Sequence, residues 1–256
     1  MKRLDLSAKE QMEIRAWRDS PTENPHSDSP ENLVNKLGDA AVFLESLDRH
    51  RALFEHAKEI LEIGAGQGWA ACIVRKKFDT PRFVLSTDIS PDAVAGGGQW
   101  ERVFSTRLDG RIAMRSYEIP LADRSIDLIF AFAAAHHFAA HRRTIREIHR
   151  VLRPGGHCLY LHEPTCRQFI YPLAHSRVNG KGMPVPEDVL IYAEFERLAR
   201  ETGLIISSQF DLSLTKRGPI ETLYYGTLRR VGPLKHVLPC TRDILFMKPG
   251  PGPTGA

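Results

Sequence analysis

Residues 60–68 read Ile-Leu-Glu-Ile-Gly-Ala-Gly-Gln-Gly, and this stretch decides the fold. Its first four residues are mostly apolar, which is typical of a short buried strand. Glycines follow at 64, 66 and 68, where the lack of a Cβ lets a ligand approach the backbone. A helix that begins there directs its free N–H groups at that ligand. The stretch therefore predicts a nucleotide-type pocket at the end of a strand.

A second strand, residues 82–88, ends in Asp88, twenty residues after Gly68. A carboxylate at this place can accept hydrogen bonds from both hydroxyls of a ribose. A dinucleotide-binding fingerprint shares both features. In this chain, however, the third glycine comes one residue early, and Trp69 stands where the fingerprint needs glycine. A pyrophosphate prefers an uncluttered helix N-terminus. The acidic Glu62 and the bulky Trp69 instead favour a zwitterionic ligand with a cationic amine.

Four sequence blocks between residues 60 and 163 stand in a characteristic order and spacing. Four blocks follow one another: Glu62-x-Gly64-x-Gly66-x-Gly68; Asp88; residues 119–129 (Ile-Pro-Leu-Ala-Asp-Arg-Ser-Ile-Asp-Leu-Ile); and residues 146–156 (Arg-Glu-Ile-His-Arg-Val-Leu-Arg-Pro-Gly-Gly). In these blocks the chain resembles the class I S-adenosylmethionine-dependent methyltransferases, particularly their small-molecule branch. The resemblance implies an α/β fold with a doubly wound, mostly parallel seven-stranded Rossmann-like sheet and an antiparallel edge strand. It also implies S-adenosyl-L-methionine as cofactor and S-adenosyl-L-homocysteine as product.

The order of the predicted elements agrees with such a sheet. Strands are expected at 60–63, 82–88, 111–115, 126–132 and 157–163, and helices at 67–78, from 91 and at 141–153. Strands that alternate with helices form parallel sheets with right-handed crossovers. Further along, a helix at 187–202 precedes strands at 204–210 and 241–248, which the resemblance pairs antiparallel at the sheet edge.

Three other segments complete the domain organisation. Residues 1–58 contain a helix up to about 20 and one or two helices at 31–56, so we expect an N-terminal helical lid on a methyltransferase domain at 59–248. Residues 164–186 and 211–240 show no clear element, and gaps of that length commonly cover a site, so we expect them to form the acceptor site. The Pro- and Gly-rich tail 249–256 is predicted to be disordered.

The resemblance assigns cofactor roles to individual residues. Glu62 would orient the methionine amino group, and Gly64, Ala65, Gly66 and Gly68 would pass close to the methionine part and the ribose. Asp88 would hold the ribose; a helix-capping role is the alternative, although Ser90 with Pro91 already fits that position. Ile89 would pack on the adenine. Many relatives carry an Asp at the adenine edge where this chain has Arg115, so Ser116, Tyr117 or backbone groups are expected there. Ala131 and Phe132 would meet the methionine end.

Candidate catalytic residues lie after the fourth and fifth strands. Methyl transfer is an in-line displacement in which alignment supplies much of the acceleration, and it requires no metal. His136, in the His136-His137 pair, is a candidate base because imidazole titrates near neutral pH; packing or helix capping is the alternative. His162 and Glu163 end the fifth strand, and since neighbours on a strand point to opposite faces, at most one should face the acceptor. The aromatic candidates for the acceptor wall are Trp17, Tyr171, Tyr192, Tyr224 and Tyr225.

Bulk composition agrees with a globular enzyme. The 256 residues suffice for one large α/β domain, with a net charge of +4. The four cysteines, at 72, 158, 166 and 240, have neither metal-site nor disulfide spacing, so a reducing, cytoplasmic compartment is expected. The N-terminus lacks a signal-peptide pattern and no apolar run is long enough to span a membrane, so we expect no membrane contact.

Three other functions are compatible with parts of the sequence. The arginines at 142, 143, 146, 150 and 153 could suit a nucleic acid, but they surround their helix, and the chain lacks both the Asn/Asp-Pro-Pro-aromatic motif and an early Pro-Cys, so no nucleic-acid partner is expected. A dehydrogenase would need the missing glycine position. A non-catalytic, cofactor-binding interaction protein stays open. The acceptor is expected to be a small molecule, with oxygen slightly preferred over nitrogen or carbon. The oligomeric state stays open as well.

Overall fold

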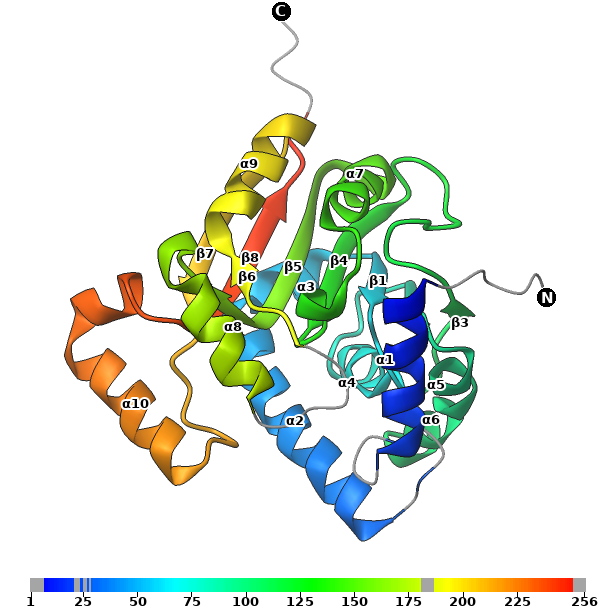
Figure 1. Cartoon of the computed structure of the whole chain (residues 1–256). Coiled ribbons are helices and arrows are strands. Elements are labelled where there is room, and N and C mark those ends of the chain that lie inside the picture. The colour runs from blue at the N-terminus through cyan, green and yellow to red at the C-terminus, as the bar shows by residue number, and fades with distance from the viewer. Residues whose placement is uncertain (1–6, 21–23, 25–26, 28, 181–186, 251–256) are drawn as a thin grey trace, which may run out of the picture.

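The computed structural model describes residues 7–20, 24, 27, 29–180 and 187–250. Its centre is a sheet with the strand order β3-β2-β1-β4-β5-β8-β7, and β6 pairs with β5 beside this path. Helices cover both faces of the sheet (Figure 1). The strands are β1 Glu59–Ile63, β2 Phe83–Asp88, β3 Gly110–Ala113, β4 Ile126–Phe132, β5 Leu152–Cys166, β6 Leu190–Ile191, β7 Ile205–Phe210 and β8 Cys240–Met247.

The pairing confirms the predicted doubly wound sheet. All neighbouring strands are parallel except where β8 takes part, because β8 runs antiparallel to both β5 and β7. The predicted antiparallel pairing at the sheet edge is therefore present, with β7 outermost and β8 just inside it. The strand order reverses between β1 and β4, and ligands of such sheets bind at that switch point, beyond the carboxyl ends of the strands.

Two apolar layers hold the helices on the sheet. Successive strand residues point to opposite faces, so Ile60 and Leu61 belong to different clusters. One layer packs α2 Pro30–Arg49, α3 Arg51–His56, α4 Trp69–Lys77 and α6 Gly98–Val103 on the sheet. The other packs α7 His141–Val151 and α9 Tyr192–Thr202. In α7 the buried residues Thr144, Ile145, Ile148 and Val151 recur at helical spacing, which explains why an arginine-rich segment folds against the sheet.

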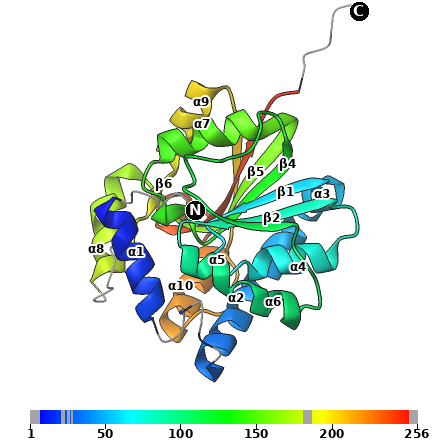
Figure 2. The same ribbon diagram turned by 90° about the vertical axis from the view of Figure 1, so that its right-hand side faces the viewer.

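The N-terminal helix stands apart from these layers. Helix α1, Ala8–Asp19, begins with a capping box in which Ser7 and Glu10 satisfy each other's backbone N–H groups. Figure 2 shows α1 on the side of the molecule where the strands of the central sheet end, opposite α3, which leads into β1. In the part of the chain that the structure describes, no helix is long and apolar enough to cross a bilayer.

The two segments expected to lack regular structure in fact contain helices. Residues 164–186 include η2 Gln168–Ile170 and α8 Tyr171–Asn179, and residues 211–240 include α10 Pro219–Arg230 and η3 Gly232–His236. Helix α10 buries Tyr225 and Leu228 against Cys240 in a small cluster of its own, away from the main core. This local packing stabilises a helix whose sequence pattern, interrupted by glycines and prolines, is weak.

The ends of several other helices differ by a few residues from those predicted, for identifiable reasons. The helix expected at 187–202 begins at Tyr192, because Leu190 and Ile191 pair with Thr165 and Cys166 of β5. The helix expected from 67 begins at Trp69, after the left-handed Gly68. Residues 251–256 of the predicted tail lie outside the described residues.

A buried ion network fastens α2 to the far edge of the sheet. Arg49 at the end of α2 donates to Asp243 on β8 (Nε–Oδ2 2.9 Å) and pairs with Asp211 after β7 (3.0 Å). His50 Nε2 lies 3.0 Å from the same Asp243 oxygen. Both carboxylates are buried, at 1% exposure each. Removing a cation from such a network leaves uncompensated buried charge.

We predict that Arg49→Met lowers the free energy of unfolding by about 3 kcal/mol, because Asp211 and Asp243 lose their shared cation. Urea denaturation of the full chain would measure this loss. The matched control is Arg51→Met two residues later, which breaks an exposed pair with Glu55 and should cost less than about 1 kcal/mol. Equal losses in the two variants would contradict the role assigned to the network.

Candidate active site

The glycine stretch forms a tight loop between β1 and α4. Gly64, Gly66 and Gly68 all have positive φ angles (68°, 52° and 74°), which side chains rarely adopt. A Cβ on Gly64 would come 2.8 Å from the Cβ of Ala134, whereas a Cβ on Gly66 would meet nothing within 4 Å. The loop therefore packs against the end of β4 at Gly64 and presents bare backbone to open space at Gly66.

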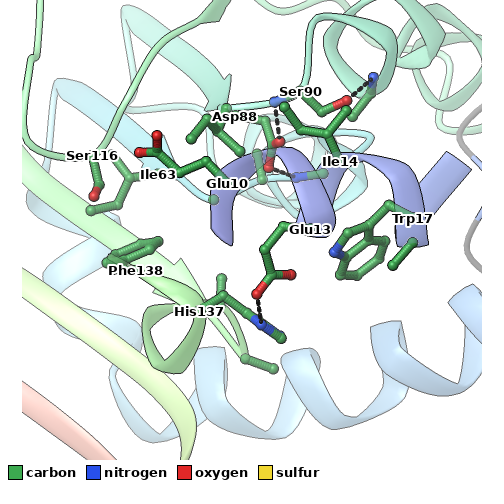
Figure 3. A pocket seen from close by; sticks show the side chains of 18 of the residues that line it. Glu10, Glu13, Ile14, Trp17, Ile63, Asp88, Ser90, Ser116, His137 and Phe138 are labelled. Carbon is green, nitrogen blue, oxygen red and sulfur yellow. Dashed lines mark hydrogen bonds and ion pairs between the residues drawn. The ribbon is translucent and has the colours of Figure 1, made fainter. Parts of the chain in front are cut away.

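Asp88 braces this loop from the end of β2. Its Oδ2 accepts from the Gly66 N–H (2.8 Å) and its Oδ1 accepts from the Ser90 N–H (2.8 Å), as Figure 3 shows. Each oxygen keeps a further acceptor site for a ligand hydroxyl. The N-cap of α5, Pro91–Gly96, is Ser90, whose Oγ accepts from the Ala93 N–H at 3.2 Å. Ser90, and not Asp88, therefore caps the N-terminus of α5.

Glu62 lies beneath the loop and is 2% exposed. Its Oε2 accepts one hydrogen bond, from the Ala71 N–H at 3.1 Å. Burial, aided by the nearby Asp88 and opposed by that N–H, raises the pKa of Glu62 well above its usual range. A cationic amine bound beside Glu62 would favour the ionised form and lower this pKa again.

A cavity of about 980 Å³ opens over these residues. This volume is at the upper end of the range, roughly 300–1,000 Å³, that is usual for small-molecule sites. Its walls come from the glycine loop, the ends of β2 and β4, and α1. Among the described residues that line it, seven are Asp or Glu and three are Lys or Arg. This balance suits a ligand with positive charge, such as a sulfonium with an amine.

Helix α1 closes one side of the cavity with polar contacts (Figure 3). Glu10 accepts from the Tyr117 hydroxyl (2.7 Å), and the Glu13 carboxylate lies 3.1 Å from His137 Nδ1. Trp17 meets the ring of His137 edge-on. Sequence reasoning had named Trp17 as a possible wall but missed Glu10, Glu13 and Ile14. Their spacing with Trp17 (i, i+3, i+4, i+7) describes one helix face and could have identified them.

On the opposite side, Glu163 holds the end of β4 and His136 in place. The carboxylate is fully buried and accepts from the backbone N–H groups of Ala134 (2.9 Å), Ala135 (2.8 Å) and His136 (3.1 Å). It also lies 2.8 Å from His136 Nδ1. His136 lines the cavity and Glu163 does not. Glu163 is therefore a positioning residue, which leaves Nε2 as the imidazole nitrogen available to the cavity.

The two members of this pair shift each other's pKa in opposite directions. Burial alone would lower the pKa of His136, but the Glu163 carboxylate outweighs it and raises that pKa. Burial alone would raise the pKa of Glu163, but His136 and the backbone N–H groups outweigh it and lower that pKa. Because one pKa rises and the other falls, the ion pair persists over a wider pH range than the isolated groups would allow.

His162 points elsewhere, because β5 contains a bulge. The register with β8 shifts between Tyr160 and Glu163, and His162 has a φ of 58°. Its Nδ1 lies 2.6 Å from Asp211 Oδ2, and its ring stacks on Phe132. Despite burial, this imidazole, the Ser213 N–H and Arg49 lower the pKa of Asp211 to about 2. Neither His162 nor Glu163 lines the large cavity.

His162 lines a second cavity of about 230 Å³. This cavity is bounded by Asp39 and Val42 of α2, by Phe132 and Ala133 after β4, and by Thr215, Lys216, Arg217 and Glu221. Asp39, Phe132 and Ala133 line both cavities, so the two adjoin at the end of β4. Segment 211–240 thus contributes to the smaller cavity. Residues 164–180, the described part of segment 164–186, line neither.

The predicted cofactor residues divide into two groups. Glu62, Gly64, Ala65, Gly66, Asp88, Ile89, Ser116, Tyr117 and Phe132 line the large cavity. Gly68 and Ala131 do not: Gly68 caps α4 so tightly that a Cβ would come 2.6 Å from Ser86 Oγ, and Ala131 is buried in the core. Arg115 pairs with Glu10 and Glu118 and does not line the cavity. Tyr171, Tyr192, Tyr224 and Tyr225 are also absent from this wall.

Comparison with known proteins agrees with this geometry. A methyltransferase-domain family model matches residues 61–160. A 27-O-demethylrifamycin SV methyltransferase of Amycolatopsis mediterranei is 29% identical over 160 residues, which are 60% of this chain and 56% of the relative. A malonyl-(acyl-carrier protein) O-methyltransferase of Marinomonas sp. is 26% identical over 89% of this chain and 78% of the relative.

The fold also matches solved structures. The geranyl diphosphate C-methyltransferase of Streptomyces coelicolor, solved with Mg2+, geranyl diphosphate and S-adenosyl-L-homocysteine, superposes with a TM-score of 0.68 at 11% identity. The match covers 96% of this chain and 100% of that one. At this identity the likeness concerns the fold alone.

The sheet order, the glycine loop and the carboxylate after β2 together define a Rossmann-like methyltransferase fold. The family match over residues 61–160 and the named relatives support a class I S-adenosylmethionine-dependent methyltransferase domain, with S-adenosyl-L-methionine as its cofactor.

We predict that Glu163→Gln lowers the pKa of His136, because the variant removes the negative charge that raises it. Histidine titration by NMR would show the His136 resonance shifting at lower pH than in the wild type. The control is His157, whose pKa burial alone lowers, and its titration should not change. An unchanged His136 titration would contradict the coupling.

Proposed function

We propose that this chain transfers a methyl group from S-adenosylmethionine to a small-molecule acceptor by in-line displacement, with an oxygen acceptor slightly preferred. The observation that carries the proposal is the His136–Glu163 pair on the wall of a cavity whose floor is the glycine loop. An imidazole that a carboxylate orients through Nδ1 is a common arrangement for a general base. The relatives that share this domain act, by their names, on a rifamycin, a malonyl carrier protein and geranyl diphosphate.

The cavity residues fit the cofactor's functional groups. We assign the methionine amine to Glu62, the ribose hydroxyls to Asp88 and the adenine to Ile89, Ser116 and Tyr117. The bare backbone at Gly66 leaves room for a ligand beside Asp88. The surplus of carboxylates along the wall complements the positive charges of the sulfonium and the amine. Phe132 would then lie at the methionine end, next to His136.

In this assignment His136 is the base. Its Nε2 takes the proton from the acceptor hydroxyl while Nδ1 stays fixed on Glu163. When bound, S-adenosylmethionine supplies an electrophilic methyl on a sulfonium. This methyl would pass to the acceptor oxygen as the carbon–sulfur bond breaks with its electron pair on sulfur, and the His136 imidazole would hold the released proton and its positive charge. The raised pKa of His136 makes its neutral form a stronger base.

The remaining segments would close the site around the acceptor. We propose that the N-terminal helices act as the lid, since α1 lines the cavity through Glu10, Glu13 and Trp17. The second cavity would hold the distal part of the acceptor, because it adjoins the first at Phe132 and Ala133. Segment 211–240 would then shape acceptor selectivity from there.

The decisive experiment measures S-adenosylhomocysteine released by the full chain in the presence of candidate acceptors. The panel contains a hydroxylated polyketide, an acyl carboxylate, a prenyl diphosphate and an amine. Acceptor-dependent product that carries the methyl on oxygen supports the proposal. Product methylated on carbon or nitrogen overturns the oxygen preference, and cofactor binding without turnover on any acceptor supports an interaction protein instead.

We predict that Asp88→Asn weakens S-adenosylhomocysteine binding roughly tenfold to a hundredfold, because charge-assisted bonds to the ribose hydroxyls become neutral. Isothermal titration calorimetry would measure the change. Asp79→Asn alters an exposed carboxylate and serves as the control. Equal affinity in the Asp88 variant, or wild-type binding of NAD in place of S-adenosylhomocysteine, would refute the cofactor assignment.

We predict that His136→Gln lowers kcat by about 10²- to 10⁴-fold with an acceptor identified in the panel, while cofactor affinity stays close to wild type. The wild-type rate should rise with pH through the raised pKa of His136, since only the neutral imidazole accepts a proton. In Glu163→Gln the rise of the rate with pH should occur at lower pH than in the wild type. If the rate depends on pH in both variants as it does in the wild type, His136 is not the base, and alignment of the substrates alone drives the transfer.

A further inference from the structure

The helices that follow β5 and β7 carry most of the strongly exposed apolar side chains. Among the described residues, the five most exposed large apolar side chains include four from this region, namely Ile220 (77%), Leu223 (74%), Phe169 (71%) and Leu173 (68%). Phe169 and Leu173 belong to η2 and α8, and Ile220 and Leu223 belong to α10. Scattered exposed apolar residues are normal, but a concentration of large ones indicates an interaction surface.

One side-chain contact links the helices that carry these residues. The guanidinium of Arg177 lies 5.6 Å from the ring centre of Tyr224, which joins α8 to α10. Leu173 precedes Arg177 by four residues and Ile220 precedes Tyr224 by four, so each apolar residue shares a helix face with the residue that makes the contact. At the other end, the Arg167 Nε donates to the His236 carbonyl of η3 (2.7 Å). In Figure 1, α10 lies at the edge of the molecule away from β3, and α8 lies between α10 and the centre of the view.

The same region concentrates positive charge. Residues 164–180 and 211–240 contain seven Lys or Arg and two Asp or Glu, a surplus of five, whereas the whole chain has a net charge of +4. One of the two acids, Asp211, is buried and paired with His162 and Arg49. The rest of the chain is therefore close to neutral. One of the seven cations, Lys216, is paired with Asp39 of α2, and the other six belong to the same segments as the large exposed apolar side chains.

We propose that the α8–α10 surface, formed by Phe169, Leu173, Ile220 and Leu223 with the basic residues around them, docks on an anionic lipid bilayer. Protruding aliphatic and aromatic side chains enter the boundary between headgroups and acyl chains, and arginines beside them meet the lipid phosphates. The absence of any unpaired acid other than Glu221 from residues 164–180 and 211–240 fits an anionic partner. Such peripheral docking needs no long apolar run, so it is compatible with the lack of a membrane-spanning helix among the described residues.

The test is flotation of the full chain with vesicles of phosphatidylcholine alone or of phosphatidylcholine mixed with phosphatidylglycerol. The chain should float with the anionic vesicles, remain behind with the neutral ones and dissociate at high salt, because salt screens the attraction. Ile220→Ser combined with Leu223→Ser should lower the partition coefficient about tenfold, and Arg230→Glu should lower it by a similar factor.

Two controls separate this surface from general effects of charge and hydropathy. Val103→Ser removes an apolar side chain of comparable exposure (56%) on α6, and Arg146→Glu reverses an exposed charge on α7. Both should bind vesicles like the wild type. Three results would overturn the proposal. They are equal binding to neutral and anionic vesicles, control variants that lose as much binding as the α10 variants, and no binding to either vesicle. The last result would leave an acidic protein as the partner for this surface.

Discussion

The bulge in β5 is the constraint on which the site depends. A regular strand would send His162 and Glu163 to opposite faces of the sheet at equal depth. The bulge places two residues of β5, Leu161 and His162, opposite one of β8, and it gives His162 a left-handed backbone. Glu163 is thereby turned under the end of β4, where it receives three backbone N–H groups and His136. His162 is turned to Asp211.

One consequence is a pair of carboxylate–imidazole couples on either side of Ala133. His136, held by Glu163, lines the large cavity, and His162, held by Asp211, lines the small one. Three of the five described non-glycine residues with positive φ, Ala133, His162 and Lys216, line the small cavity. Unfavourable backbone conformations persist where the surroundings enforce them and gather at functional sites. At His162 the carboxylates of Asp211 and Asp243, themselves held by Arg49, bind the side chain and the backbone N–H and enforce this conformation.

The sequence predicts the residues around the methyl donor well, and the reason is physical. A cofactor seat at a switch point is built from local signals: glycines that need positive φ, and an acid at the end of a strand. Gly64, Gly66 and Asp88 therefore stand where their motifs put them. The contact of α1 with the cavity joins Glu13 to His137 across 124 positions of sequence, and no local pattern encodes it. The helices α8 and α10 were missed because their packing partners are few and lie in a satellite cluster.

The wall of the large cavity and the outer α8–α10 surface carry charge of opposite sign. Acids dominate the wall of the large cavity, where a cationic cofactor would neutralise them, and cations dominate the α8–α10 surface. The two regions meet near the small cavity, because Glu221, the residue after Ile220, lines it. An acceptor that carries an apolar or anionic body would be attracted to the outer surface and not to the acidic wall. Under the proposed function, only its reacting end would pass Phe132 to reach His136, and the charge pattern would orient the acceptor relative to the methyl donor.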